Sequence, residues 1–108
     1  MAGKARFNIY VIELDRAVLR TARFAKANPG YVEGRPCVYV GMTARSPEER
    51  FAQHKSGYKA CRLVQRHGTR LKPRLFRSHN PMTYEVACAM ERERARRLRN
   101  RGYGVWQK

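Results

Sequence analysis

The segment RFNIYVIEL near the N-terminus constrains the fold most, because it is apolar on both sides of an extended strand. Alternation places Ile9 and Val11 on one face and Tyr10, Ile12 and Leu14 on the other. A strand that is apolar on both faces must be covered from both sides. We therefore expect this strand at the centre of a sheet.

Turn and capping signals divide the rest of the chain into further elements. Ser46 as N-cap, Pro47 at the first helical position and Glu49 as partner of a capping box predict a helix that runs to about Lys55 and stops at Ser56-Gly57. We also expect a strand in PCVYVGM that ends or bends at Gly41, helices over about 16–27 and 59–67, a short edge strand in LKPRLFR, and a last helix from Asn80-Pro81 to Gly102.

This order of elements predicts an α+β fold, with a small three-stranded, mainly antiparallel sheet flanked by helices. There are too few crossover units for a parallel sheet, and the tail YGVWQK is expected to fold Val105 and Trp106 back onto the body. A chain of 108 residues without a dividing linker is expected to form a single domain over residues 1–108.

The net charge indicates the kind of partner. The chain has 24 Lys and Arg against 8 Asp and Glu, a formal charge of +16. Such a surplus implies a polyanion, of which nucleic acid is the first candidate. A 20-residue apolar run and a secretory signal are both lacking, so we expect no membrane partner and a cytoplasmic location. The three cysteines have no C-x-x-C spacing and are expected to be free thiols.

Glu91 is the first candidate for chemistry. In the last predicted helix it falls within the apolar stripe of Tyr84, Ala87, Ala95 and Leu98, so it is expected to face inward, whereas Glu85 and Glu93 can face water. A carboxylate on such a face must be paired or must bind a cation. An ion pair with arginine and a metal site both remain open.

Arg50 and His54 are the second candidate. They stand one turn apart on one face of the helix that begins at Pro47. An arginine fork suits phosphate oxygens, and an imidazole can hold or move a proton near neutral pH. The pattern is also that of an ordinary solvated face, and both interpretations stay open on these two residues alone.

Taken in order, these groups resemble a known family of enzymes. The set is IYVI with Tyr10, YVGMT with Tyr39, then Arg50, His54 and a helical Glu91, and it resembles the GIY-YIG nucleases. The resemblance spans Ile9 to about Gly102. It implies a small sheet that carries both tyrosines, with the arginine and glutamate supplied by later helices.

Two departures from the family pattern are visible. Asn8 stands where the first glycine of the signature would be, and the connection from Tyr10 to Tyr39 is much longer than is usual in the family. The second departure implies an insertion at about 15–35 beside the site. An asparagine that some members carry after the glutamate has only Asn100 as a counterpart.

The resemblance implies a metal-dependent endonuclease that hydrolyses phosphodiester bonds. Tyr10, helped by Tyr39 or His54, would accept a proton from water, Arg50 would offset charge on the phosphate, and Glu91 would hold one Mg²⁺ or Mn²⁺ ion. Residues expected to contact the nucleic acid, DNA more than RNA, are Thr43, Arg45, Lys55, Lys59 and Arg62. The alternative is a non-catalytic basic DNA- or RNA-binding module of similar fold. The oligomeric state stays open, a dimer included.

The charge distribution predicts strongly salt-dependent binding. Basic residues gather on the last helix (Arg92, Arg94, Arg96, Arg97, Arg99 and Arg101) and around the middle helices (Lys55, Lys59, Arg62 and Arg66). If about six to eight of them contact phosphates, log K should fall against log salt with a slope of about −5 to −7, whatever the base sequence. Fluorescence anisotropy of labelled oligonucleotides over a salt series measures this slope. A slope near zero would contradict the electrostatic assignment.

Overall fold

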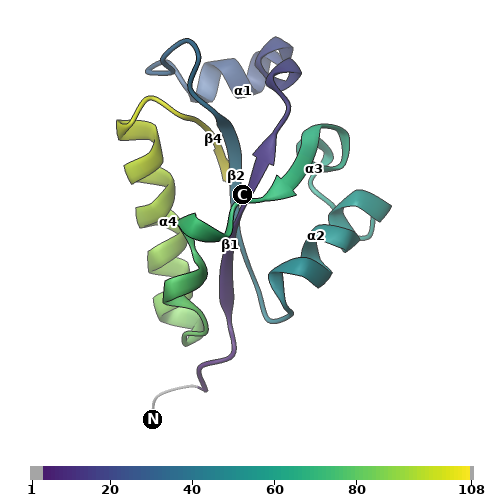
Figure 1. Ribbon diagram of the computed structural model, residues 1–108, viewed down its shortest axis with the longest axis vertical. Coiled ribbons are helices and arrows are strands. Elements are labelled where there is room, and N and C mark those ends of the chain that lie inside the picture. The colour runs from purple at the N-terminus through teal and green to yellow at the C-terminus, as the bar shows by residue number, and fades with distance from the viewer. Residues whose placement is uncertain (1–3, 108) are drawn as a thin grey trace.

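A four-stranded mixed sheet forms the centre of the computed structural model, which describes residues 4–107 (Figure 1). Its strands are β1 (Asn8–Leu14), β2 (Cys37–Thr43), β3 (Gly68–Leu71) and β4 (Gly104–Gln107), in the order β3-β1-β2-β4. β1 is antiparallel to β2 and β3, and β4 is parallel to β2. The expected α+β class and the central place of β1 are confirmed. The expectation of three strands is wrong, because β4 adds a fourth strand, parallel to β2, to an otherwise antiparallel sheet.

Two features of the chain account for the difference in the sheet. The tail was expected only to fold back, but its backbone continues into β4 and pairs Gly104 with Cys37 and Gln107 with Val40. The edge strand expected in LKPRLFR lies earlier in the chain, at Gly68–Leu71. Pro73, which has no N–H for a strand ladder, instead begins a short 3₁₀ turn.

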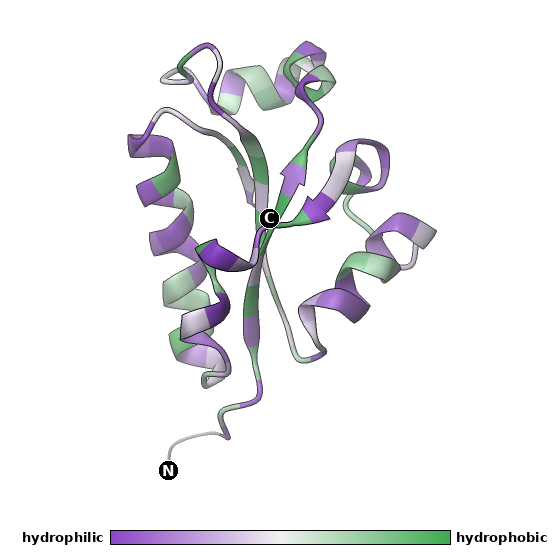
Figure 2. Ribbon diagram, in the orientation of Figure 1, coloured by the Kyte–Doolittle hydropathy of each residue, from purple (hydrophilic) through white to green (hydrophobic). Residues whose placement is uncertain are grey.

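Helices and 3₁₀ turns cover both faces of the sheet. The α-helices are α1 (Ala22–Ala27), α2 (Pro47–Ser56), α3 (Arg62–His67) and α4 (Tyr84–Asn100), and the 3₁₀ turns are η1 (Arg16–Arg20), η2 (Pro73–Leu75) and η3 (Arg77–His79). α4 lies on one side of the sheet, and α2 and α3 lie on the other (Figure 1). Figure 2 shows hydrophobic residues along the central strands and many hydrophilic residues on the helices.

The ends of the elements follow local capping chemistry. The helix expected over 16–27 is split, because Thr21 is extended (φ −79°, ψ 118°). The last helix begins at Tyr84 rather than at Asn80-Pro81, because the Thr83 hydroxyl accepts from the backbone N–H of Val86 at 3.4 Å. Asn80 is held instead by two hydrogen bonds to the backbone of Ile9.

α2 has the predicted start and stop. The Ser46 hydroxyl oxygen accepts from the Glu49 backbone N–H at 3.1 Å, and the hydroxyl also lies 3.2 Å from the Glu49 carboxylate, to which it donates. Gly57 ends the helix with a left-handed backbone (φ 90°). Of the two outcomes expected at Gly41, an end or a bend, the strand end does not occur, since β2 continues to Thr43. The helix therefore follows β2 after a loop of three residues, 44–46.

The segment between β1 and β2 fastens the C-terminal strand through one buried side chain. The Asn28 amide donates to the carbonyls of Phe24 (2.8 Å) and Val105 (3.0 Å), and its oxygen accepts from the Val105 N–H (2.8 Å) and from Arg99 Nε (3.3 Å). Asn28 is 6% exposed. One amide thus joins α1, α4 and β4.

Removing this amide should destabilise the protein. We expect Asn28→Ala to lower the free energy of unfolding by about 2 kcal/mol, because buried partners lose their hydrogen bonds. Urea denaturation followed by circular dichroism measures the change. The matched control is Asn100→Ala at an exposed helical position, which should change stability by less than about 0.5 kcal/mol. Equal effects in the two variants would contradict this role of Asn28.

Candidate functional site

Two tyrosines and a histidine meet on the face of the sheet that α2 and α3 cover. The register places Tyr10 opposite Gly41 and Ile12 opposite Tyr39, so the two phenols lie on one face and diagonally across from each other. Their ring centroids are 6.0 Å apart, and the His54 ring lies 6.0 Å from Tyr10 and 5.4 Å from Tyr39. The Tyr10 hydroxyl and His54 Nε2 are hydrogen-bonded at 2.9 Å.

Gly41 allows this arrangement because it has no side chain. A Cβ at this position would lie 2.6 Å from both Cζ and the hydroxyl of Tyr10, and 2.9 Å from Cε2 of Tyr39. Real Cβ atoms essentially never come that close to other atoms. The Tyr10 phenol therefore lies across the backbone of β2 at Gly41, and any larger residue there would displace it.

His54 is buried and has a partner on each ring nitrogen. The backbone N–H of Cys61 donates to Nδ1 at 3.2 Å, and Tyr10 occupies Nε2. Burial, and secondly the charge of Arg50, lower the pKa of His54 to about 4, so the ring is neutral at pH 7. Because Nδ1 is an acceptor, the proton of the neutral ring is on Nε2, and His54 donates to the Tyr10 oxygen.

The two phenols differ in how readily they ionise. Burial raises the pKa of Tyr10 to about 12, while the charge of Arg50, a hydrogen bond from Tyr39 and a hydrogen bond from Arg50 act to lower it. Burial raises the pKa of Tyr39 further, and the neighbouring Tyr10 and Cys61 add to that rise. Arg50 and Tyr39 oppose the effect of burial on the pKa of Tyr10, whereas the neighbours of Tyr39 add to it, so Tyr10 is the phenol that loses its proton first.

Arg50 joins the tyrosines to the loop that follows α2. Its Nη1 donates to Gln53 Oε1 at 3.1 Å and to the carbonyl of Tyr58 at 3.2 Å, and its Nη2 donates to the carbonyl of Lys59 at 2.9 Å. These three bonds fix the plane of the guanidinium. The N–H of Nε and one N–H of Nη2 are not used in these three bonds.

Glu91 approaches the tyrosines from the other side of the sheet. Its Oε1 accepts from Gln107 Nε2 at 3.1 Å, and Gln107 pairs with Val40 at the end of β4. Among the described residues, this is the last pair between β2 and β4. The charge of Glu91 raises the pKa of Tyr10 and of Tyr39, as the smallest of the causes acting on each. The carboxylate is therefore within electrostatic reach of both phenols.

The donor set suits a hard cation held mainly by non-protein ligands. Among residues 4–107, His, Cys, Asp and Glu form no group of three or more that could hold a metal ion. Glu91 offers carboxylate oxygens, and Mg²⁺ commonly binds through one or two carboxylates with water and substrate phosphate as further ligands. The residues present fit that mode of binding and do not fit an all-protein metal cage.

The residues expected to contact nucleic acid differ in their surroundings. Thr43 is 9% exposed, and its hydroxyl accepts from the backbone N–H of Arg45 at 3.0 Å, so it shapes the turn before α2. Lys55 Nζ donates to the carbonyls of Gln65 and Gly68, both at 2.9 Å, and ties α2 to the end of α3. Arg45, Lys59 and Arg62 are exposed.

Further residues of the site had no clear signal in the sequence. Cys61 acts on His54 through its backbone N–H, which any residue can supply. Gln107 reaches Glu91 only because β4 joins the sheet. Gly41 is the exception, because a glycine inside a strand often marks a place where another group packs closely against the backbone. Here that group is the Tyr10 phenol. All three cysteines are free, as expected.

Comparisons with known proteins do not identify the chain. No family model matches it, and neither a curated protein nor a solved structure gives a match. The resemblance to the GIY-YIG nucleases therefore stays a prediction that rests on the residues named above. Within residues 4–107, no helix combines the length and the apolar character that crossing a membrane requires.

The buried, neutral His54 predicts a loss of stability in mild acid. Its pKa is lowered to about 4 in the folded protein from the ordinary value of 6.5, so only the unfolded chain gains this proton between these pH values. The free energy of unfolding should fall by up to about 3 kcal/mol as the pH drops from about 6.5 to 4. Urea titrations across this range measure the loss.

A variant pair isolates the contribution of His54. In His54→Asn the free energy of unfolding should fall much less between about pH 6.5 and 4. In His67→Gln it should fall as much as in the unmodified protein. NMR titration of the His54 ring in the unmodified protein gives a direct check. A midpoint near 6.5 would show that the ring is not buried in its neutral form.

Proposed function

We propose that this protein is a divalent-metal-dependent endonuclease of the GIY-YIG kind, acting on phosphodiester bonds of nucleic acid. The observation that carries the proposal is the hydrogen bond from His54 to Tyr10 beside Arg50, on the same face as Tyr39. Hydrolysis of a phosphodiester needs a group that accepts the proton of water and a cation that offsets charge on the phosphate. Tyr10 and Arg50 supply groups of these kinds.

The base in this proposal is Tyr10. His54 donates to its oxygen, and Tyr39 and Arg50 act to lower its pKa, so all three favour the phenolate form. His54 does not compete for the role, because its Nδ1 is occupied by the Cys61 N–H and its Nε2 carries the proton. Its function here is to orient Tyr10 and to donate to the oxygen as negative charge develops.

Arg50 binds the phosphate with the N–H groups that the loop carbonyls leave. Its bonds to Tyr58 and Lys59 hold the guanidinium in one orientation before the ligand arrives, which lowers the entropy cost of binding. Glu91 is the residue proposed to hold Mg²⁺ or Mn²⁺. When bound, such a cation supplies charge stabilisation at the phosphate and favours ionisation of the nearby phenol.

The substrate proposed is DNA in preference to RNA, on the basis of the family resemblance. A formal charge of +16 favours either polymer equally. Incubation with labelled single- and double-stranded DNA and RNA, with Mg²⁺ or with a chelator, distinguishes the two.

A non-catalytic nucleic-acid-binding module is the second candidate. Tyr10, Tyr39 and His54 are only 1%, 4% and 1% exposed, which is also what a structural hydrogen-bonded core would show. Such a module would bind oligonucleotides with the same dependence on salt and would leave them intact in Mg²⁺.

Conservative variants test the catalytic roles. Tyr10→Phe removes the base and keeps the packed ring, and Glu91→Gln removes the charge that would hold the cation. Each should lower the rate of Mg²⁺-dependent cleavage by about 10²-fold or more, while binding of the oligonucleotide in chelator changes little. Single-turnover cleavage of an end-labelled substrate measures the rate.

Matched variants on exposed sites are the controls for these experiments. Tyr84→Phe and Glu85→Gln change the same chemical groups at exposed positions of α4 and should keep wild-type rates. Thermal melts confirm that each variant is folded. Full cleavage by either Tyr10→Phe or Glu91→Gln would reject that residue's role, and no cleavage by the unmodified protein on any substrate would favour the binding module.

A further inference from the structure

A basic hollow lies between the N-terminal end of α1 and α3. Its lining consists of Thr21, Arg23, Arg62, Leu63, Arg66 and His67. Three arginines and a histidine thus surround one concave space, and no carboxylate is among these lining residues. A site of this composition suits an anion, because several guanidinium groups can donate to it together.

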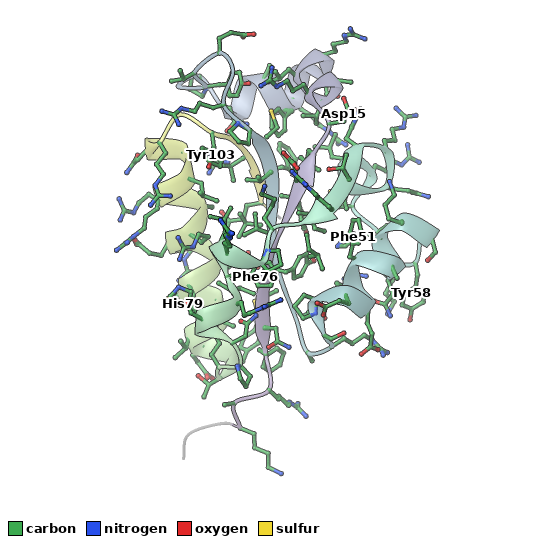
Figure 3. The ribbon with its side chains drawn as sticks, in the orientation of Figure 1. Asp15, Phe51, Tyr58, Phe76, His79 and Tyr103 are labelled. Carbon is green, nitrogen blue, oxygen red and sulfur yellow. The ribbon has the colours of Figure 1, made fainter. Side chains whose placement is uncertain are left out.

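The hollow is built on packed elements rather than on loose chain. Leu63 at its base is 3% exposed, and Val18 of the adjoining η1 turn is fully buried. The backbone N–H of Asp15 donates to the carbonyl of His67 at 2.7 Å and fastens the end of α3 to the start of η1. The Asp15 carboxylate accepts from the Ala17 N–H, and Figure 3 shows Asp15 at this junction.

Arg23 is held in place by an aromatic ring. Its guanidinium carbon lies 5.7 Å from the centroid of the Trp106 ring, which is within the range of a cation–π contact. The ring occupies one face of the guanidinium and leaves the N–H groups at its edge able to bind an anion. Trp106 in turn pairs with Tyr39 in the parallel register of β2 and β4.

Two structural links connect the hollow to the candidate site. Trp106, under Arg23, lies next to Tyr39 on the same face of the sheet, because paired residues of parallel strands point the same way. Arg62 follows Cys61, whose N–H binds His54. A polyanion that passes the tyrosines toward α1 would therefore meet the hollow.

We propose that this hollow binds a backbone phosphate of the nucleic acid, away from the phosphate at Arg50, and that residues 15–35 serve to supply Arg23 to it. The inference rests on the proposed function only in taking nucleic acid as the ligand, and it requires no cleavage. The hollow fixes the direction in which the strand leaves the catalytic residues, and Arg66 completes the site from α3.

Trp106 gives a local readout, because it is the only tryptophan in the chain. Titration with a thymidine oligonucleotide in chelator, excited at a wavelength that the bases do not absorb, should change the tryptophan emission in a saturable way. Arg23→Ala should abolish this change. Arg66→Ala, which does not touch the ring, should weaken binding and reduce the magnitude of the log K against log salt slope by about 0.7 to 0.9.

Controls separate this site from general charge effects and from free anions. Arg6→Ala removes one charge from an exposed position before β1, at the opposite end of this strand from η1 and α1, and should keep the saturable change in emission. Inorganic phosphate is titrated in parallel. If it saturates the signal and the oligonucleotide does not displace it, the hollow is a small-anion site and the proposal is wrong. An unchanged emission with bound oligonucleotide, or equal effects in Arg66→Ala and Arg6→Ala, would also overturn it.

Discussion

The packing of Tyr10 across Gly41 is the contact on which the rest of the site depends. Cross-strand neighbours in an antiparallel pair lie close enough for side chains to touch, and a glycine opposite an aromatic residue lets the ring lie over the backbone. The Tyr10 hydroxyl then lies beside α2, where it is hydrogen-bonded to His54. The register of β1 and β2 thereby sets the position of the group proposed as base.

The same contact explains how an imidazole can be buried in a protein with such a large positive charge. A protonated ring would repel Arg50 one helical turn away, and burial would strip its water. The neutral ring avoids both costs, and its two nitrogens are satisfied by Tyr10 and the Cys61 backbone. His54 is therefore a fixed part of the core that also directs a hydrogen bond at the phenol.

Elements that depend on nearby capping residues could be predicted from the sequence, whereas elements that depend on long-range contacts could not. The Ser46 cap and the Gly57 stop are short-range signals, and α2 has the bounds that they indicate. β4 depends on Asn28, which lies 77 residues from Val105 in sequence, and no local pattern carries that information. The late start of α4 reflects the local Thr83 cap together with the tertiary hydrogen bonds of Asn80 to Ile9.

For the site, the sequence indicated which residues have the right chemistry but not how they are arranged. Tyr10, Tyr39, Arg50 and His54 come together because two adjoining strands and the helix after them share one face. Glu91 was expected to face inward from its place in the stripe of α4, and α4 covers the opposite side of the sheet. Its hydrogen bond from Gln107 depends on the pairing of β4 with β2, which spacing along a helix does not reveal.

The occupied nitrogens of His54 have a consequence for the metal ion of the proposed function. A ring with partners at both Nδ1 and Nε2 has no lone pair to offer, so softer ions that favour imidazole, such as Zn²⁺ or Ni²⁺, gain nothing from it. Oxygen is the donor that Glu91 presents. Selectivity for small, hard ions would then arise from the type of donor atom, oxygen and not nitrogen. It would not require a binding site of fixed size.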